Sequence, residues 1–167
     1  RWYQLEEEQP LLSEDEVYNL TIAKGTLTDE ERQVINNHIV ATIKMLDTLP
    51  FPKNLQNVPE FAGGHHEKMD GTGYPRGLTG EQMSMQARIM AIADIFEALT
   101  AKDRPYKEGK KLSESLRILG FMKQDNHIDP ELFKLFISEG IYQKYADTYL
   151  APEQIDAVDI SKIPGFQ

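Results

Sequence analysis

Residues 83–101 decide the fold of this 167-residue chain and read Met-Ser-Met-Gln-Ala-Arg-Ile-Met-Ala-Ile-Ala-Asp-Ile-Phe-Glu-Ala-Leu-Thr-Ala. The stretch is too long for a strand and is apolar around most of its circumference, so it predicts a central, buried helix. The rest of the chain shows no alternating apolar runs bounded by hairpin signals. The sequence therefore predicts an all-α fold, a helical bundle.

Start and stop signals place further helices around this one. Thr28 and Glu31 have the spacing of a capping box, and apolar residues at helical spacing follow them up to the Pro50 and Pro52 stop. The other expected helices are a short one near residues 13–16, one from Pro59 through the His65-His66 pair, 112–122 capped by Ser113, one capped by Asp129 with Pro130 first, and 141–150 after Gly140. We expect a linker and short helix in 1–26, a helical domain in 27–150 and a C-terminal tail in 151–167.

Composition narrows the function classes. The formal net charge of −9 argues against broad binding to duplex nucleic acid. The chain has no cysteine, so a bound metal would need nitrogen and oxygen ligands, as iron, manganese or zinc accept. No run is long enough to span a membrane and none resembles a secretory signal, so we expect a cytoplasmic location without membrane contact. The absence of Met at residue 1 suggests a fragment of a longer protein.

Residues 65–75 form the most informative motif and read His-His-Glu-Lys-Met-Asp-Gly-Thr-Gly-Tyr-Pro. Two successive imidazoles can serve one ion or neighbouring ions. Gly71 and Gly73 permit sharp turns and close approach of the backbone to a ligand. Pro75 fixes its own φ and favours an extended Tyr74. The motif thus predicts a metal site joined to a shaped ligand loop.

Asp94 is the second signal, because it interrupts the apolar residues 90–96. A buried carboxylate without a partner costs several kcal/mol, on the order of 2–7 even for a neutral polar group, so Asp94 needs a cation or a donor. A metal ion meets that need, and so does an ion pair with a nearby Arg or Lys such as Arg88. The sequence leaves both open.

His38 shares a helical face with Ile35, Ile39 and Met45, which predicts that it points inward. A lone inward His is usually a core residue. Together with His65, His66 and Asp94, it completes a set on three helices typical of metal sites in helical bundles. His127 receives no metal role.

Arg104 and Lys107 follow the Asp94 helix and are suited to gripping phosphates, although they equally suit the negative C-terminal end of the helix.

These residues resemble the HD-GYP family, a branch of the HD phosphohydrolase superfamily, from about residue 25 to 150. The resemblance rests on the 65–75 motif, on His38, and on residues 25–31, 92–100, 103–107 and 129–130. It implies an all-α HD-type bundle, bacterial signal transduction, a divalent metal centre of iron or manganese, and hydrolysis of cyclic di-GMP. The implied metal ligands are His38, His65, His66 and Asp94. The implied substrate contacts are Asp70, Gly71, Gly73, Tyr74, Pro75, Arg104 and Lys107.

The chain departs from the family at its eponymous His-Asp dyad. By the family's spacing the dyad belongs near residues 9–14, which read Gln-Pro-Leu-Leu-Ser-Glu, and no His-Asp pair occurs elsewhere. Acidic residues in 6–16 offer partial substitutes, but they are more simply a solvated face. No catalytic residue is therefore assigned.

Three interpretations remain open. The first is a metal-dependent cyclic di-GMP phosphodiesterase. The second is a degenerate, non-catalytic module that binds cyclic di-GMP or a protein partner, such as a GGDEF domain or a second copy. The third is a hydrolase of another phosphate ester.

Overall fold

The computed structural model describes residues 12–21, 28–102 and 109–166. In these ranges the chain forms α-helices and 3-10 turns and no strand, which confirms the all-α prediction. The α-helices are α1 Glu14–Leu20, α2 Asp29–Asp47, α3 Val58–Gly63, α4 Met85–Thr100, α5 Leu112–Gln124, α6 Pro130–Ser138 and α7 Ile141–Tyr149; the 3-10 turns are η1 Lys53–Leu55, η2 Pro152–Gln154 and η3 Ile160–Lys162. The chain divides into two compact units, Arg1–His38 and Ile39–Gln167.

In the first unit, local capping starts both helices. Ser13 and Glu16 form a capping box on α1, in which the Glu16 amide donates to the Ser13 hydroxyl at 3.2 Å. At the start of α2, the Thr28 amide donates to the Glu31 carboxylate at 2.9 Å and the Glu31 amide to the Thr28 hydroxyl at 3.1 Å. The predicted starts of both helices are confirmed.

The predicted inward face of α2 is only partly buried. Ile39 is 1% exposed, but Ile35 is 50% and Met45 61% exposed, and His38 is exposed too. The prediction that His38 points inward is therefore wrong. Spacing fixes which residues share a helical face, but burial depends on what packs against that face.

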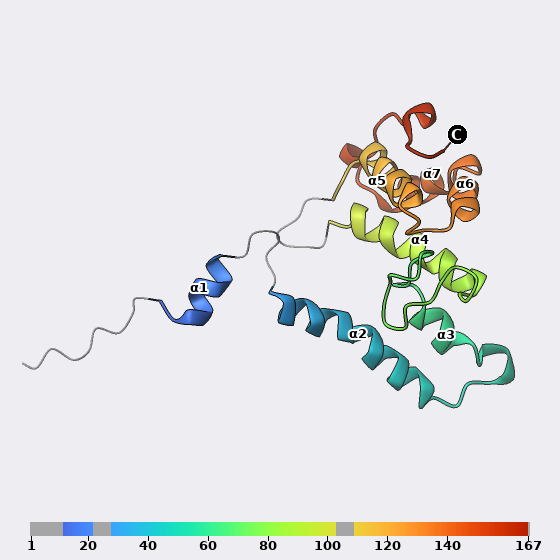
Figure 1. Ribbon diagram of the computed structural model, residues 1–167. Coiled ribbons are helices and arrows are strands. Elements are labelled where there is room, and N and C mark those ends of the chain that lie inside the picture. Colours follow the sequence, from blue (N-terminus) through green and yellow to red (C-terminus); the bar gives the residue numbers. More distant parts are fainter. Residues whose placement is uncertain (1–11, 22–27, 103–108, 167) are drawn as a thin grey trace, which may run out of the picture. The chain divides into compact units, whose positions relative to one another are not determined.

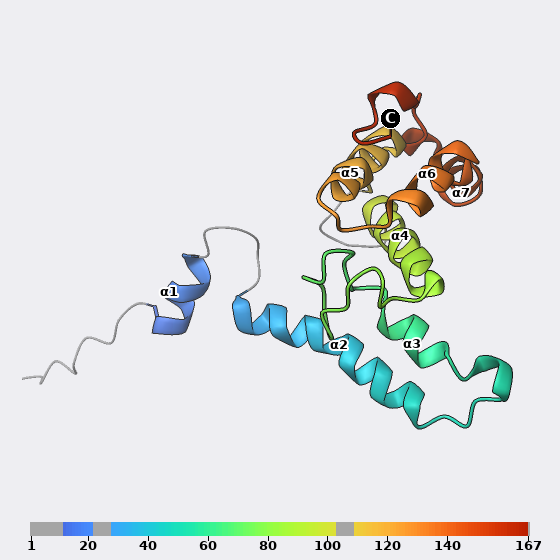
Figure 2. The same cartoon turned by 45° about the vertical axis from the view of Figure 1, so that its right-hand side comes forward.

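The second unit is organised around α4. Helix α3 packs beside the start of α4, and α5 and α6 pack beside the rest of it, with α7 against α6 (Figures 1 and 2). The core joins α4 to the later helices and to the C-terminal segment, through Ile92, Phe96, Leu116, Leu119, Phe133, Ile137 and Ile163. Phe96 packs edge-on against Phe136 and Tyr145.

Helix α4 is buried on one face only. Its buried residues are Ala87, Ala91, Ile92, Phe96 and Thr100, which recur at helical spacing. Met85, Ile89 and Met90 are exposed. The prediction of a helix at this place is confirmed, but the prediction that the helix is buried holds for one face only.

The later helices follow their sequence signals with one exception. The Asp129 carboxylate accepts the Glu131 and Leu132 amides and Pro130 is the first residue of α6, as predicted. Gly140, at φ 59°, separates α6 from α7. Ser113, the predicted cap of α5, lies inside that helix, and its amide donates to Asp156 from the C-terminal segment at 2.9 Å. None of the helices in the described ranges is long and apolar enough to cross a membrane.

Candidate metal and ligand-loop site

The His pair lies in a turn after α3, not on the predicted helix. Helix α3 ends at Gly63, and Gly64 approaches α4 so closely that a Cβ there would lie 2.8 Å from the Ala87 Cβ. A distance of 2.8 Å is too short for two carbon atoms in contact. Gly64 thus lets the turn lie against α4, and His65 and His66 follow it directly in the sequence.

His65, His66 and Asp94 form a group that can hold a metal ion, here called the His-His-Asp group. One ligand atom from each residue lies within 4.8 Å of the others. The two imidazole centroids are 4.1 Å apart. His65 Nδ1 lies 2.6 Å from the Ala62 carbonyl oxygen, and donation there makes Nε2 the lone-pair nitrogen. Two imidazoles and a carboxylate are a donor set that suits zinc, iron or manganese.

Asp94 is exposed, which corrects the expectation that it is buried. It lies on the open side of α4, where its carboxylate meets the His pair. The alternative of an ion pair with Arg88 is also wrong, because Arg88 Nη1 pairs with Asp129 Oδ2 at 2.5 Å. Asp94 therefore belongs with the imidazoles and not with the helix's own arginine.

His38 lies in the other unit, on α2. Its Nδ1 lies 2.5 Å from the Ile35 carbonyl oxygen, the same contact with a carbonyl three residues earlier that His65 makes. Donation at Nδ1 again leaves Nε2 as the lone-pair nitrogen. Its role as a fourth metal ligand stays a prediction.

The Gly-Tyr-Pro loop, residues 67–80, brings Tyr74 onto the His-His-Asp group. The Tyr74 amide donates to the His66 carbonyl at 3.2 Å. The rings of Tyr74 and His66 stack with centroids 4.9 Å apart and planes 19° from parallel. The Tyr74–Pro75 peptide bond is cis. Burial and, after it, the charge of Asp94 raise the pKa of the Tyr74 hydroxyl, so the phenol remains protonated well above neutral pH.

Asp70 and Gly71 shape the first turn of this loop. Asp70 Oδ1 accepts the Thr72 amide and the Thr72 hydroxyl, both at 2.8 Å, and these bonds lower the pKa of Asp70. Gly71 has a φ of 79°, which L-residues rarely adopt. The contact of either residue with substrate stays a prediction.

The loop is attached near its start to the connection between α5 and α6. The Met69 amide donates to the His127 carbonyl at 3.3 Å, and the Asp70 amide to the Asn126 carbonyl at 3.2 Å. Burial and then the charge of Lys68 lower the pKa of His127, against the opposing effect of Asp70 and Asp125. This attachment had no signal in the sequence.

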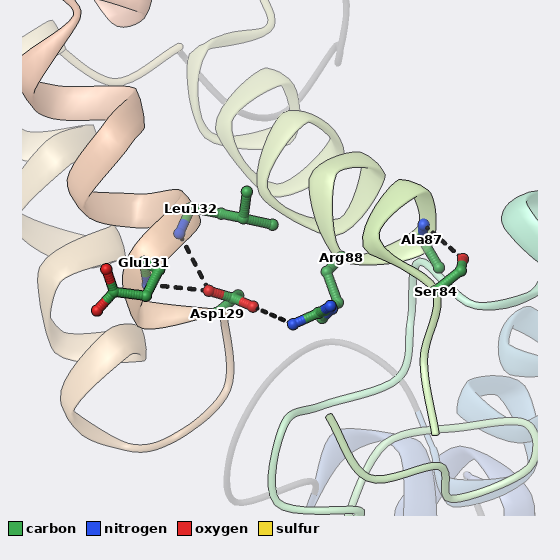
Figure 3. A network of polar contacts seen from close by, with 6 residues as sticks. All are labelled: Ser84, Ala87, Arg88, Asp129, Glu131 and Leu132. Atoms are coloured by element: carbon green, nitrogen blue, oxygen red, sulfur yellow. Dashed lines mark hydrogen bonds and ion pairs between the residues drawn. The ribbon is translucent and has the colours of Figure 1, made fainter. Parts of the chain in front are cut away.

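A second polar contact ties α4 to α6. The Asp129 carboxylate that caps α6 also binds Arg88, and Ser84 caps the start of α4 through the Ala87 amide at 3.2 Å (Figure 3). Arg88 lies six positions before Asp94 on the same helix, so the Arg88–Asp129 ion pair helps to fix the position of the helix that carries Asp94. Arg104 and Lys107, the predicted phosphate contacts, lie outside the described residues.

The fold and this site define a class: an all-helical domain with a His-His-Asp metal group beside a Gly-Tyr-Pro loop. A family model described as an HD domain matches residues 14–132. The chain belongs to the HD domain family.

Bacterial enzymes are among its relatives. It is 41% identical over 112 residues to the 3'3'-cGAMP-specific phosphodiesterase 3 of Vibrio cholerae, covering 65% of this chain and 23% of that protein. It is 39% identical over 119 residues to a cyclic di-GMP phosphodiesterase of Pseudomonas aeruginosa, covering 71% and 28%. It is 32% identical over 130 residues to a cyclic di-GMP phosphodiesterase of Thermotoga maritima, covering 78% and 34%. The chain thus spans about a quarter to a third of the length of these relatives, and the predicted HD-GYP resemblance is confirmed.

Proposed function

We propose that this chain binds and hydrolyses a cyclic dinucleotide, with cyclic di-GMP as the substrate, as an HD-GYP-type metal-dependent phosphodiesterase. The stack of Tyr74 on His66, with centroids 4.9 Å apart, carries the proposal, because it joins a metal-binding group directly to a ligand-binding loop. The names of the relatives support the choice of substrate.

His65, His66 and Asp94 would hold the metal ion, which we propose to be iron or manganese, with His38 as a further ligand. A bound divalent ion supplies a Lewis acid for the phosphodiester and lowers the pKa of a coordinated water. The half-buried Tyr74 offers a ring for stacking on a base and a hydroxyl that stays protonated, and therefore donates, at neutral pH. Arg104 and Lys107 are proposed to bind phosphate, on the sequence alone.

The alternative is a regulatory module that binds cyclic di-GMP, a GGDEF domain or a second copy without hydrolysis. It is favoured by one observation: the 167 residues contain no His-Asp pair. In that case the His-His-Asp group and the Gly-Tyr-Pro loop recognise the ligand, and water activation is missing.

Turnover and binding measured on the same preparation separate the two. The protein is loaded with Mn²⁺ or Fe²⁺ under reducing conditions, incubated with cyclic di-GMP, and the products are separated by chromatography. Metal-dependent appearance of linear or mononucleotide product, lost in Asp94→Asn, supports the enzyme. Calorimetric binding without product supports the regulatory module. If folded, metal-loaded protein shows no binding and no product, both proposals are contradicted.

Competition defines the substrate within the class. Equal concentrations of cyclic di-GMP and 3'3'-cGAMP are offered together, because relatives are named for each. We expect faster loss of cyclic di-GMP. If 3'3'-cGAMP is lost faster, the proposed phosphodiesterase activity stands, but its substrate is 3'3'-cGAMP and not cyclic di-GMP.

A further inference from the structure

Glu67 is a buried carboxylate that the proposed chemistry does not use. It directly follows the His pair and is 1% exposed. A carboxylate at such a place is costly unless both oxygens accept hydrogen bonds. Both do: Oε1 accepts the Arg76 amide at 2.7 Å and Oε2 accepts the Leu78 amide at 2.9 Å. The donors lie 9 and 11 residues further along, so one side chain joins the start of the loop to its end.

The two contacts require a carboxylate of this length. Two backbone amides are both donors, and an ionised carboxylate presents an acceptor to each. A Gln side chain of the same shape has one acceptor, and its NH₂ group would face the other amide as a second donor. An Asp side chain is one methylene shorter. The site therefore discriminates Glu from its isostere by hydrogen bonding and not by size.

Closing the loop brings its middle against its start. A Cβ on Gly73 would lie 2.4 Å from both the Glu67 Cα and the Lys68 nitrogen, so residue 73 rests directly on the Glu67–Lys68 backbone. The next residue, Tyr74, is the one that stacks on His66. The carboxylate of Glu67, held between Arg76 and Leu78, thus encloses the segment that carries the stacked ring.

We propose that Glu67 is the positioning residue of the Gly-Tyr-Pro loop: its carboxylate closes the loop and thereby holds Tyr74 on the ring of His66. Glu67 does not act as a metal ligand, because both oxygens are engaged by amides and it is not a member of the group formed by His65, His66 and Asp94. Only the consequence for cyclic dinucleotide binding depends on the proposed function. The positioning itself does not.

The test compares Glu67→Gln with Glu81→Gln, a matched change at an exposed residue just after the loop. Tyrosine rings are labelled with ¹³C, and the Tyr74 signal is assigned by its loss in Tyr74→Phe. We expect the ring-current shift from His66 to disappear in Glu67→Gln, while the signals of Tyr142 and Tyr145 in the core stay in place. Glu81→Gln should match the unmodified chain. An unchanged Tyr74 signal in folded Glu67→Gln would overturn the proposal.

Amide hydrogen exchange on the unmodified chain gives a second test that needs no variant. We expect the Arg76 and Leu78 amides to be protected, because each donates to a buried oxygen. Exchange at the rate of an unstructured peptide would overturn the proposal even if Glu67→Gln failed to fold.

Ligand binding completes the comparison. Mn²⁺ affinity should change less than about threefold in Glu67→Gln, since none of the proposed metal ligands is altered, whereas cyclic di-GMP should bind more than about tenfold more weakly. If the unmodified chain binds no dinucleotide, the proposed function fails while the Tyr74 signal still decides the role of Glu67. If Glu67→Gln loses the stack of Tyr74 on His66 but binds cyclic di-GMP as tightly as the unmodified chain, the positioning of Tyr74 has no role in dinucleotide binding.

Discussion

The His-His-Asp group and the Gly-Tyr-Pro loop touch each other but are held in place differently. The group draws its ligands from a turn after α3 and from the open face of α4, and Asp94 is exposed. The loop is held by its own hydrogen bonds, because Glu67 accepts amides from the end of the loop and Asp70 accepts the Thr72 amide. Backbone hydrogen bonds to the α5–α6 connection hold it from outside.

This difference separates what the polypeptide fixes from what a metal would fix. Three side chains whose ligand atoms lie within 4.8 Å of one another can all bind one ion, and such an ion would hold them together. A loop whose amides and carboxylates already bond to each other keeps its shape without one. We therefore expect substitutions in the group to act on metal affinity and substitutions in the loop to act on ligand affinity and stability.

The largest expected effect is that of Asp94→Ala on metal affinity. It removes the carboxylate of the group, and we expect Mn²⁺ to bind about 100-fold more weakly, since even indirect partners of metal ligands are worth 10–100-fold. Calorimetry measures it. Glu97→Ala is the matched control, because it removes the same charge from an exposed position one turn further along α4. Equal losses in the two variants would mean that the effect is general electrostatics.

The second effect tests the contact between α4, which carries Asp94, and α6, which follows the connection to which the loop is attached. Asp129→Ala removes the cap of α6 and leaves Arg88 without its carboxylate, so the free energy of unfolding should fall by about 2–3 kcal/mol. Urea unfolding measures it. Asp159→Ala is the control, because it also removes a cap and an ion pair, but between exposed side chains. If the two variants had equal midpoints, the Arg88–Asp129 pair would have no structural role.

Local signals in the sequence predicted most of the fold. The signals that worked act within one helical turn, so residue types suffice to place the helix boundaries. They are Thr28 with Glu31, Asp129 with Pro130, and Gly140. Burial was harder to predict. His38 and Asp94 lie on helices as expected, yet both are exposed, because exposure depends on packing partners that periodicity does not name.

The sequence predicted which residues form the site better than it predicted the hydrogen bonds that hold them in place. His65, His66 and Asp94 were grouped by residue type, and the structure brings them together. Glu67 was missed, because its partners are 9 and 11 residues away and are backbone amides, which every sequence contains. Its only signal was an acidic residue placed directly after two candidate ligands. Arg104 and Lys107 are outside the described residues, and their role stays a prediction.

The third effect breaks the loop and leaves the metal ligands in place. In Gly73→Ala the new Cβ would lie 2.4 Å from Glu67 Cα, so the backbone must move, at a cost of about 1–3 kcal/mol. We expect cyclic di-GMP affinity to fall and Mn²⁺ affinity to be retained, both measured by calorimetry. Gly140→Ala is the control, since it strains a positive φ with nothing within 4 Å. Loss of metal binding in Gly73→Ala would show that the two regions are not held independently.

The smallest effect concerns the attachment of the loop to the α5–α6 connection. Burial and then Lys68 lower the pKa of His127 in the folded chain, so below its ordinary value near 6.5 the unfolded chain binds more protons. His127 therefore contributes full stability above that pH, and the contribution is lost as the pH falls below it. The urea midpoint of metal-free protein, compared at about pH 7.5 and 5.5, should fall less in His127→Gln than in the unmodified chain.

Lys68→Met separates the two causes of this shift. It removes the cation that adds to the effect of burial and keeps the imidazole, so the pKa of His127 should move back towards its ordinary value. The decline in stability with acid should then be intermediate between those of the unmodified chain and His127→Gln. Because Asp70 and Asp125 oppose the shift, removing either carboxylate should steepen the decline instead. An unchanged decline in all of these variants would mean that the acid sensitivity of the chain arises elsewhere, and that the loop is attached to the α5–α6 connection through backbone contacts alone.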